Sequence, residues 1–448
     1  MMKLHSLLCI VFFAVGCVPS SGVTKAAKGQ ENMKEKPLMR DFIGLNTHTN
    51  QFRAELYQPV TRLLRDYHNF NWDVGDDTSR PTKFPMSHDS VKVNWEQLYG
   101  SWRKAGYKIN ATVQFGKVEQ KSWKNPAADA YNYGLAFGKF FGPSSPPDLV
   151  ESMEIGNEPG HYDDAFYRTI FENMARGLRE ADPKLKVATC ATFAHESGKY
   201  HKNIETVKGL EHLYDIINVH SYAQVEGYPT WRRSFPEDPK IKYLKDIQEM
   251  IDWRNANAPD KEVWLTEFGW DSSTKPPAAE GTFKNWVGVT DTQQAQYIVR
   301  SFLVFSAMDM DRAYLYWFND SDRPSVHASS GLTRNYQPKP SFHAVAHLLK
   351  TLGDYRFIRA ATQKTDDVYA YEYQHATDPA QRIWAVWSPT GADRKTDVTI
   401  VLNGTAIKAE RMPLTPGVPE SVSWGVGNNG EIKLTVGEAP TFLWVTTR

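Results

Sequence analysis

The sequence of 448 residues contains little cysteine, has no net charge and lacks a long apolar run, and each shortage excludes something. The three cysteines are Cys9, Cys17 and Cys190, and the first two lie at the N-terminus. If export removes the segment that holds Cys9, and Cys17 becomes the new first residue, only Cys190 remains as a free thiol. No disulfide then forms within the chain, and a large apolar core must hold the fold together.

Charge is balanced, with 52 Lys and Arg against 52 Asp and Glu. Proteins that bind nucleic acid rely on a basic surface, so this balance argues against a nucleic-acid partner. The His and Asp residues show no metal-ligand spacing, and we expect neither a metal nor a cofactor. Past the N-terminus no apolar run approaches the length of a membrane span.

The first 17 residues indicate an export signal. Lys3 and His5 precede an apolar run from Leu7 to Val15, which is too short to cross a bilayer. The sequence "AVGC" at 14–17 resembles a bacterial lipobox, so we expect Cys17 to carry a lipid, which would be the protein's one contact with a membrane. Residues 18–36 are expected to form a flexible tether. The protein is therefore predicted to be a periplasmic or outer-membrane, cell-surface lipoprotein. The alternative is ordinary signal cleavage and secretion.

Short apolar strands alternate with amphipathic helices from residue 39 to about residue 350. Alternation of this kind predicts a parallel sheet, and eight repeats over roughly 300 residues predict a (β/α)₈ barrel, which we place at 37–354. A doubly wound open sheet is the alternative, but no Gly-rich phosphate loop follows the first strand. The expected strands are 41–48, 69–75, 107–116, 152–160, 185–194, 214–223, 261–270 and 312–320, and the expected helices include 58–67, 93–106, 163–183, 291–308 and 339–354.

The pattern changes at about residue 355. Short alternating strands separated by Gly, Pro and Asn predict an antiparallel β-sandwich at 355–448. No spacer rich in Pro, Gly and Ser precedes it, so we expect the sandwich to pack on the barrel through apolar contacts.

The residues that end the expected strands are the candidates for chemistry, because active sites of such barrels lie at the carboxyl ends of the strands. The fourth strand ends in Asn157 and Glu158, and the seventh carries Glu267. A closed barrel can bring these two carboxylates face to face. Paired carboxylates about 5 Å apart are the apparatus of retaining glycoside hydrolysis. Alternation places Glu154 deeper in the barrel, where it needs a hydrogen-bonding partner.

These motifs resemble the clan A glycoside hydrolases, which carry Asn-Glu-Pro at the end of strand four and a Glu at the end of strand seven. The resemblance implies that Glu158 is the acid/base and Glu267 the nucleophile. It further implies substrate-binding roles for Asn157 at the sugar 2-hydroxyl, His220 on the cavity wall, Tyr222 beside the nucleophile and Trp317 as a sugar platform. The "EIGNEP" segment and the trailing sandwich resemble the β-xylosidase/α-iduronidase branch.

Two departures leave the sugar open. Where many clan members have an Arg at the end of strand two, the expected strand instead holds "NWDVGDD", and strand three ends in Gln114 where a His is common. Five further residues are candidates for substrate binding by their position at or after the ends of strands one, six and seven, namely His48, Trp231, Arg232, Arg233 and Trp270. The two arginines indicate either a subsite for an anionic sugar or a solvated loop.

The aromatic content of 13% fits either a large aromatic core or a sugar-binding cleft. Together these patterns predict a retaining β-glycoside hydrolase that is endo-acting on a polysaccharide, with a sulfated algal galactan of the carrageenan, porphyran or agar type as the finer hypothesis. The alternatives are an exo-acting, xylosidase-like β-glycosidase and a non-catalytic glycan-binding surface lipoprotein. The expected partner in each case is an oligosaccharide or polysaccharide.

Overall fold

The computed structural model describes residues 35–361, 368–402, 404–427 and 430–447. The predicted export signal, the lipidation site at Cys17 and nearly all of the predicted tether lie outside the described residues. Within the described part of the chain, no helix is both long enough and apolar enough to cross a membrane.

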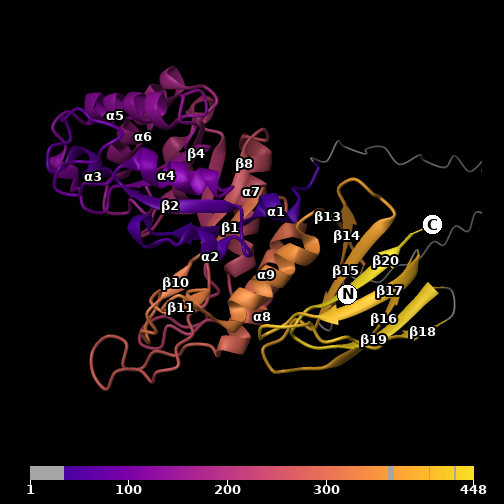
Figure 1. Ribbon diagram of the computed structural model, residues 1–448. Coiled ribbons are helices and arrows are strands. Elements are labelled where there is room, and N and C mark those ends of the chain that lie inside the picture. The colour runs from indigo at the N-terminus through magenta and orange to yellow at the C-terminus, as the bar shows by residue number, and fades with distance from the viewer. Residues whose placement is uncertain (1–34, 362–367, 403, 428–429, 448) are drawn as a thin grey trace, which may run out of the picture. The chain divides into compact units, whose positions relative to one another are not determined.

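Parallel strands close into a barrel (Figure 1), which confirms the predicted fold class. Around the ring each strand pairs with the next, and the last pairs back to the first, as in Leu45 opposite Leu315. Within the described residues the eight barrel strands are β1 (Ile43–Thr47), β2 (Leu63–Asn69), β3 (Lys108–Gln114), β4 (Ser152–Ile155), β5 (Lys186–Phe193), β7 (Ile216–His220), β8 (Glu262–Phe268) and β9 (Arg312–Leu315). A short strand β6 (Lys202–Asn203) pairs with the end of β5.

The second strand differs from the prediction. Residues 58–67 were expected to form a helix and 69–75 a strand, but β2 covers Leu63–Asn69 and a short helix α3 covers Phe70–Val74. The charged residues of β2 are buried, and each has a partner: Arg65 binds Glu154, and Asp66 accepts a hydrogen bond from Tyr99. Burial of charged side chains is tolerated where they are paired, so the charges of β2 are compatible with a barrel strand.

Helices cover the outside of the barrel, so most of its strands are buried on both faces. The predicted helices at 93–106, 163–183, 291–308 and 339–354 are confirmed. Helix α8 begins with a capping box, in which Thr290 and Gln293 each bond the other's backbone N–H. The helices are α1 (Met39–Phe42), α2 (Ala54–Tyr57), α4 (Trp95–Lys104), α5 (Pro126–Phe141), α6 (Asp164–Ala181), α7 (Tyr243–Asn257), α8 (Asp291–Ala307) and α9 (Pro340–Leu352), with 3₁₀ turns at Thr49–Gln51, Gln120–Ser122, Ile204–Val207 and Glu211–Leu213.

Two antiparallel sheets follow the barrel and enclose a core that includes Trp384, Ile400 and Leu434, which confirms the predicted sandwich. The larger sheet has the order β13 (Tyr355–Ala360), β14 (Tyr369–His375), β15 (Gln381–Trp387), β20 (Thr441–Thr446) and β17 (Thr405–Arg411). The smaller has the order β16 (Thr396–Val401), β19 (Glu431–Val436) and β18 (Gly425–Val426). Three short strands lie in the loop after β9, namely β10 (Asn319–Asp320), β11 (Thr333–Arg334) and β12 (Gln337–Pro338).

The larger sheet packs against barrel helix α8. Trp387 belongs to the same apolar cluster as the barrel core, and its Nε1 donates to Glu237 Oε1 at 2.7 Å. Glu237 also pairs with Arg300 of α8, which donates to the carbonyl of Thr390 at 2.8 Å. Apolar contacts and hydrogen bonds to a buried ion pair of the barrel therefore join the sandwich to the barrel.

Candidate active site

Glu158 and Glu267 meet at the mouth of the barrel. Strand β4 ends at Ile155, and Gly156 follows with φ +83°, a conformation that costs glycine little. The chain turns there, so Glu158 lies beyond the end of β4. Glu267, in contrast, lies within β8, next to its last residue, Phe268. A carboxylate oxygen of each Glu and a ring nitrogen of His220 all lie within 4.8 Å of one another.

The Glu267 carboxylate is held by three donors. Oε1 accepts from Arg65 Nη1 at 3.0 Å and from the Tyr67 hydroxyl at 2.5 Å, and Oε2 accepts from the Tyr222 hydroxyl at 2.9 Å. Burial by itself would raise the pKa of Glu267, but the neighbouring His220 and Arg65 and the Tyr67 hydrogen bond outweigh it and lower that pKa to about 2. Glu267 is therefore ionised at neutral pH, as a carboxylate nucleophile must be.

Glu158 has the opposite environment. Burial raises its pKa, and the negative charge of Glu267 adds to this effect, while the hydrogen bond from His220 opposes it. His220 Nδ1 lies 3.1 Å from Glu158 Oε1, and its N–H donates to that carboxylate. The pKa values of the two carboxylates are thus shifted in opposite directions, as expected where one carboxyl group holds a proton and the other is ionised.

Arg65 connects the parts of the site. It is fully buried, and it binds Glu154 through Nε and Nη2, both at 2.8 Å. Nη2 also donates to Asn157 Oδ1 at 2.7 Å, and Nη1 reaches Glu267. Glu154 accepts a further bond from Thr112 at 2.7 Å, so the partner predicted for this carboxylate is present.

Sequence reasoning missed Arg65 because it misplaced strand two. The expected departure from the clan pattern at that strand was wrong: β2 does carry an arginine, and the "NWDVGDD" segment lies after it. Asp73 of that segment is buried away from Glu158 and Glu267, with His68, Trp95 and Tyr133 as its partners. An arginine inside the apolar run "LLRDY" was the signal that could have found it.

A cavity of about 880 Å³ surrounds the two carboxylates. Trp317 stacks on Tyr316, with ring centres 5.4 Å apart and planes 11° apart, and His48 meets Trp317 edge-on at 6.5 Å. Most of the predicted substrate-binding residues line this cavity, namely Asn157, His220, Tyr222, Trp317, His48 and Trp231. Residues that line it and were not predicted include Tyr67, Gln114, Phe193, Tyr200, His201, Asp246, Phe283, Tyr316 and His327.

Three predicted residues do not line the cavity. Trp270 is buried in the core, where its Nε1 donates to the Ser234 carbonyl at 2.8 Å. Arg232 pairs with Glu226 in the loop after β7. Arg233 is buried between Asp271, 3.0 Å away, and the ring of Tyr222, whose centre is 4.3 Å from the guanidinium carbon. Their ion pairs occupy both arginines, so in this structure neither presents a free cation to a sugar.

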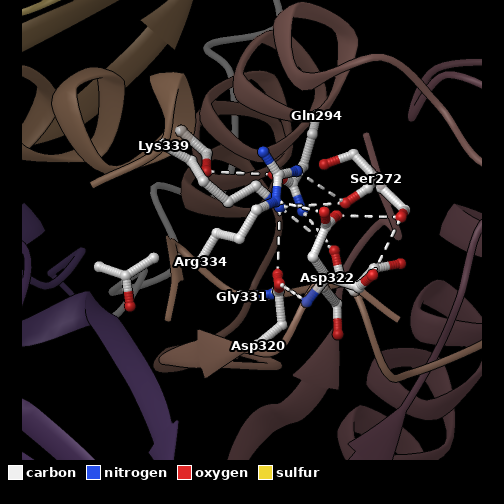
Figure 2. A network of polar contacts seen from close by, with 12 residues as sticks. Ser272, Gln294, Asp320, Asp322, Gly331, Arg334 and Lys339 are labelled. Atoms are coloured by element: carbon white, nitrogen blue, oxygen red, sulfur yellow. Dashed lines mark hydrogen bonds and ion pairs between the residues drawn. The ribbon is translucent and has the colours of Figure 1, made fainter. Parts of the chain in front are cut away.

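A network of charged and polar groups, which includes Ser272, Asp320, Arg334 and Lys339, lies in the loops that follow β8 and β9 (Figure 2). Lys339, which is 2% exposed, lies 3.2 Å from Asp320 Oδ2 and from the Ser329 carbonyl. Arg334 binds Asp291 at 2.8 Å and reaches the Ser272 carbonyl at 3.1 Å. The network ties the loop after β8 to the loop after β9, which carries Trp317 and His327 to the cavity.

The Glu158, His220 and Glu267 atoms are close enough together to surround a metal ion. The oxygens of Glu267, however, already accept bonds from Arg65, Tyr67 and Tyr222. The arrangement suits proton transfer and nucleophilic attack by the carboxylates themselves.

No family model matches the chain. A Bifidobacterium longum protein described as an exo-alpha-(1->6)-L-arabinofuranosidase is 22% identical over 248 residues, which are 48% of this chain and 46% of that protein. The matched region thus spans about half of that relative's length.

Solved structures share the fold over nearly the whole chain. A family 39 glycoside hydrolase from the gut symbiont Bacteroides cellulosilyticus WH2 superposes with a TM-score of 0.67 at 15% identity, covering 92% of this chain and 81% of that one. A family 30 subfamily 8 xylanase from Clostridium acetobutylicum gives 0.58 at 12% identity, covering 92% and 97%. A family 51 alpha-L-arabinofuranosidase from Bifidobacterium longum gives 0.59 at 15% identity, also covering 92% and 97%. This chain therefore has the fold of these glycoside hydrolases, as the resemblance in its motifs predicted.

Proposed function

We propose that this protein is a retaining glycoside hydrolase in which Glu267 is the nucleophile and Glu158 the acid/base. The observation that carries the proposal is a pair of carboxylates within 4.8 Å of each other whose pKa values are shifted in opposite directions. Retaining enzymes hold their two carboxyl groups about 5–5.5 Å apart, whereas inverting enzymes need roughly 6.5–9.5 Å to admit a water molecule between carboxylate and sugar.

The reaction takes two displacements at the anomeric carbon. Glu267 attacks that carbon while Glu158 gives its proton to the departing glycosidic oxygen, which leaves a glycosyl ester on Glu267. The ester carries no charge, so the repulsion that raised the pKa of Glu158 disappears. Glu158 then accepts a proton from water, and that water replaces Glu267 at the anomeric carbon with net retention.

The surrounding residues hold these two groups in place. Arg65, Tyr67 and Tyr222 fix both oxygens of Glu267, and His220 fixes Glu158. Asn157 Oδ1 accepts a hydrogen bond from Arg65, which leaves the amide nitrogen of Asn157 to donate to a sugar hydroxyl. The buried nitrogens His48 Nδ1 and Trp317 Nε1 have no partner among the described residues, and a ligand rich in hydroxyls suits them.

The finer substrate prediction stays a prediction. The hypothesis of a sulfated galactan relied on Arg232 and Arg233, and the ion pairs of these two residues give it no added support. One observation favours exo action, namely the partial similarity to an exo-acting arabinofuranosidase. Export to the periplasm or cell surface remains part of the proposal. A purely glycan-binding protein would need neither carboxylate nor the opposed pKa shifts.

The test is a panel of neutral and sulfated glycans and nitrophenyl glycosides incubated with purified protein. Product mass identifies the sugar, and the size distribution of early products separates endo from exo action. Proton NMR of the first product should show the anomeric configuration of the substrate. An initially inverted product would refute the assigned roles, and no hydrolysis of any panel member would refute the proposed activity.

A further inference from the structure

A second cavity, of about 460 Å³, adjoins the first at Glu158. The two cavities share four lining residues, namely Gln114, Asn157, Glu158 and Tyr200. Glu158 is also the more open of the two carboxylates, with its side chain 27% exposed against 7% for Glu267. An acid must reach the glycosidic oxygen, so the group that departs with this oxygen lies on the side of Glu158. The second cavity is placed where that leaving group would be.

Tyr200 stands at the junction of the two cavities. It is 55% exposed, which is unusual for a large aromatic residue in a cavity wall. Lys199 Nζ lies 5.0 Å from the centre of its ring. An exposed tyrosine offers an apolar ring face and a polar hydroxyl, and a pyranose likewise has an apolar face of C–H groups and hydroxyls around its edge.

The loop that carries Tyr200 packs directly on the turn that carries Glu158. A Cβ built on Gly160 would lie 2.1 Å from the carbonyl oxygen of Lys199, so only glycine allows this approach. This contact gives a structural reason for the glycine that follows Asn157-Glu158-Pro159.

The same loop is anchored at its far end. Lys202 is 2% exposed, and its ammonium binds Asp164 Oδ1 at 2.9 Å and the carbonyl of Tyr162. The Asn203 N–H donates to Ser197 Oγ at 2.9 Å, which closes the loop on itself. Packing on both sides therefore sets the position of Tyr200 relative to Glu158.

We propose that Tyr200 is the stacking platform of a leaving-group subsite, and that the second cavity receives a pyranose as the leaving group. This inference rests on the proposed function. It implies that the enzyme cleaves glycosidic bonds between two sugars. A stacking platform beside the acid cannot contribute to binding when the leaving group is a single atom.

The experiment compares two leaving groups on the same sugar. The probes are the disaccharide and the β-glycosyl fluoride of the sugar that the glycan panel releases, for example xylobiose and β-xylosyl fluoride. For Tyr200→Ala we expect kcat/KM on the disaccharide to fall about tenfold, which corresponds to about 1.4 kcal/mol, with less than about a twofold change on the fluoride. Tyr200→Phe keeps the ring and should stay near the wild-type value on both.

Tyr131→Ala is the matched control. Tyr131 is a partly exposed tyrosine of α5 that lines neither cavity and bonds Glu180. Its replacement should alter neither probe, and thermal unfolding of all variants checks that they are folded. Equal loss on both probes for Tyr200→Ala, or no loss on the disaccharide, would overturn the subsite and leave the proposed function standing. Failure of the wild-type protein to cleave any glycan would overturn both.

Discussion

Replacing Arg65 tests how the buried centre of the site works. The Arg65 side chain contacts Glu154, Asn157, Asn46, Tyr67 and Glu267, and it is fully buried. Arg65→Met keeps an unbranched side chain, although a shorter one, and removes every donor. Glu154, which is also fully buried, would keep Thr112 as its one side-chain donor among the described residues.

The expected cost follows from that unpaired carboxylate. Breaking a buried ion pair by removing one partner costs about 3–5 kcal/mol, because it leaves an uncompensated charge in the interior. Replacing both partners by apolar groups of similar size is often nearly neutral. We therefore expect Arg65→Met to lower the free energy of unfolding by about 3–5 kcal/mol, and the double variant Arg65→Met/Glu154→Met to recover most of that loss.

Activity should not recover with stability. Arg65 is one of the charges that lower the pKa of Glu267 to about 2, and it also orients Asn157. Without it the pKa of Glu267 rises, so the acid limb of kcat/KM moves to higher pH in both variants. Urea unfolding gives the stabilities, and pH profiles of kcat/KM on a panel substrate give the second readout.

Two results would refute this reasoning. If the double variant regained wild-type kcat/KM and the wild-type acid limb, Arg65 would serve only to neutralise Glu154. If Arg65→Met were as stable as the wild type, the buried pair would not be the structural element described here.

Three further predictions follow from the site and the core. The Glu158→Ala variant should still be glycosylated by a dinitrophenyl glycoside, whose leaving group needs no proton, and added azide should then yield the β-glycosyl azide. The Glu267→Ala variant should be inactive, and added azide should yield the α-glycosyl azide. If the two azide products were exchanged, the roles of Glu158 and Glu267 would have to be exchanged too. Burial and the charge of Glu267 raise the pKa of Glu158, so wild-type kcat/KM should fall as pH rises and that proton is lost, and a profile of Glu158→Ala that kept this basic limb would contradict the assignment. Burial raises the pKa of Cys190 to about 12, so a protein lacking the first 34 residues should react with Ellman's reagent only after unfolding, and rapid reaction of the native form would show that the strand is open.

The local sequence pattern was enough to predict those site residues that lie at or near the ends of barrel strands. Glu267 lies near the end of β8 and Glu158 lies just past the end of β4, and a closed parallel barrel leaves little choice about where such strand ends go. The same reasoning predicted that His220, Tyr222 and Trp317 line the cavity, and the structure confirms this. The prediction was wrong for Trp270, which lies past the end of β8 and is buried in the core. Beyond the end of a strand, the path of the loop decides which side chains face the cavity, and the strand pattern does not predict that path.

The sequence by itself determined the barrel, the sandwich and the two carboxylates, because strand periodicity and the motifs at strand ends are local properties. Only the tertiary structure decided which groups surround those carboxylates. The partners of Arg65 lie 89 and 202 positions away along the chain, and its burial becomes intelligible only when strands β2, β4 and β8 close around it. Tyr200 likewise lies beside Glu158 because its loop packs on Gly160. Pairing across a barrel is a long-range property, and no short window of the chain contains both partners.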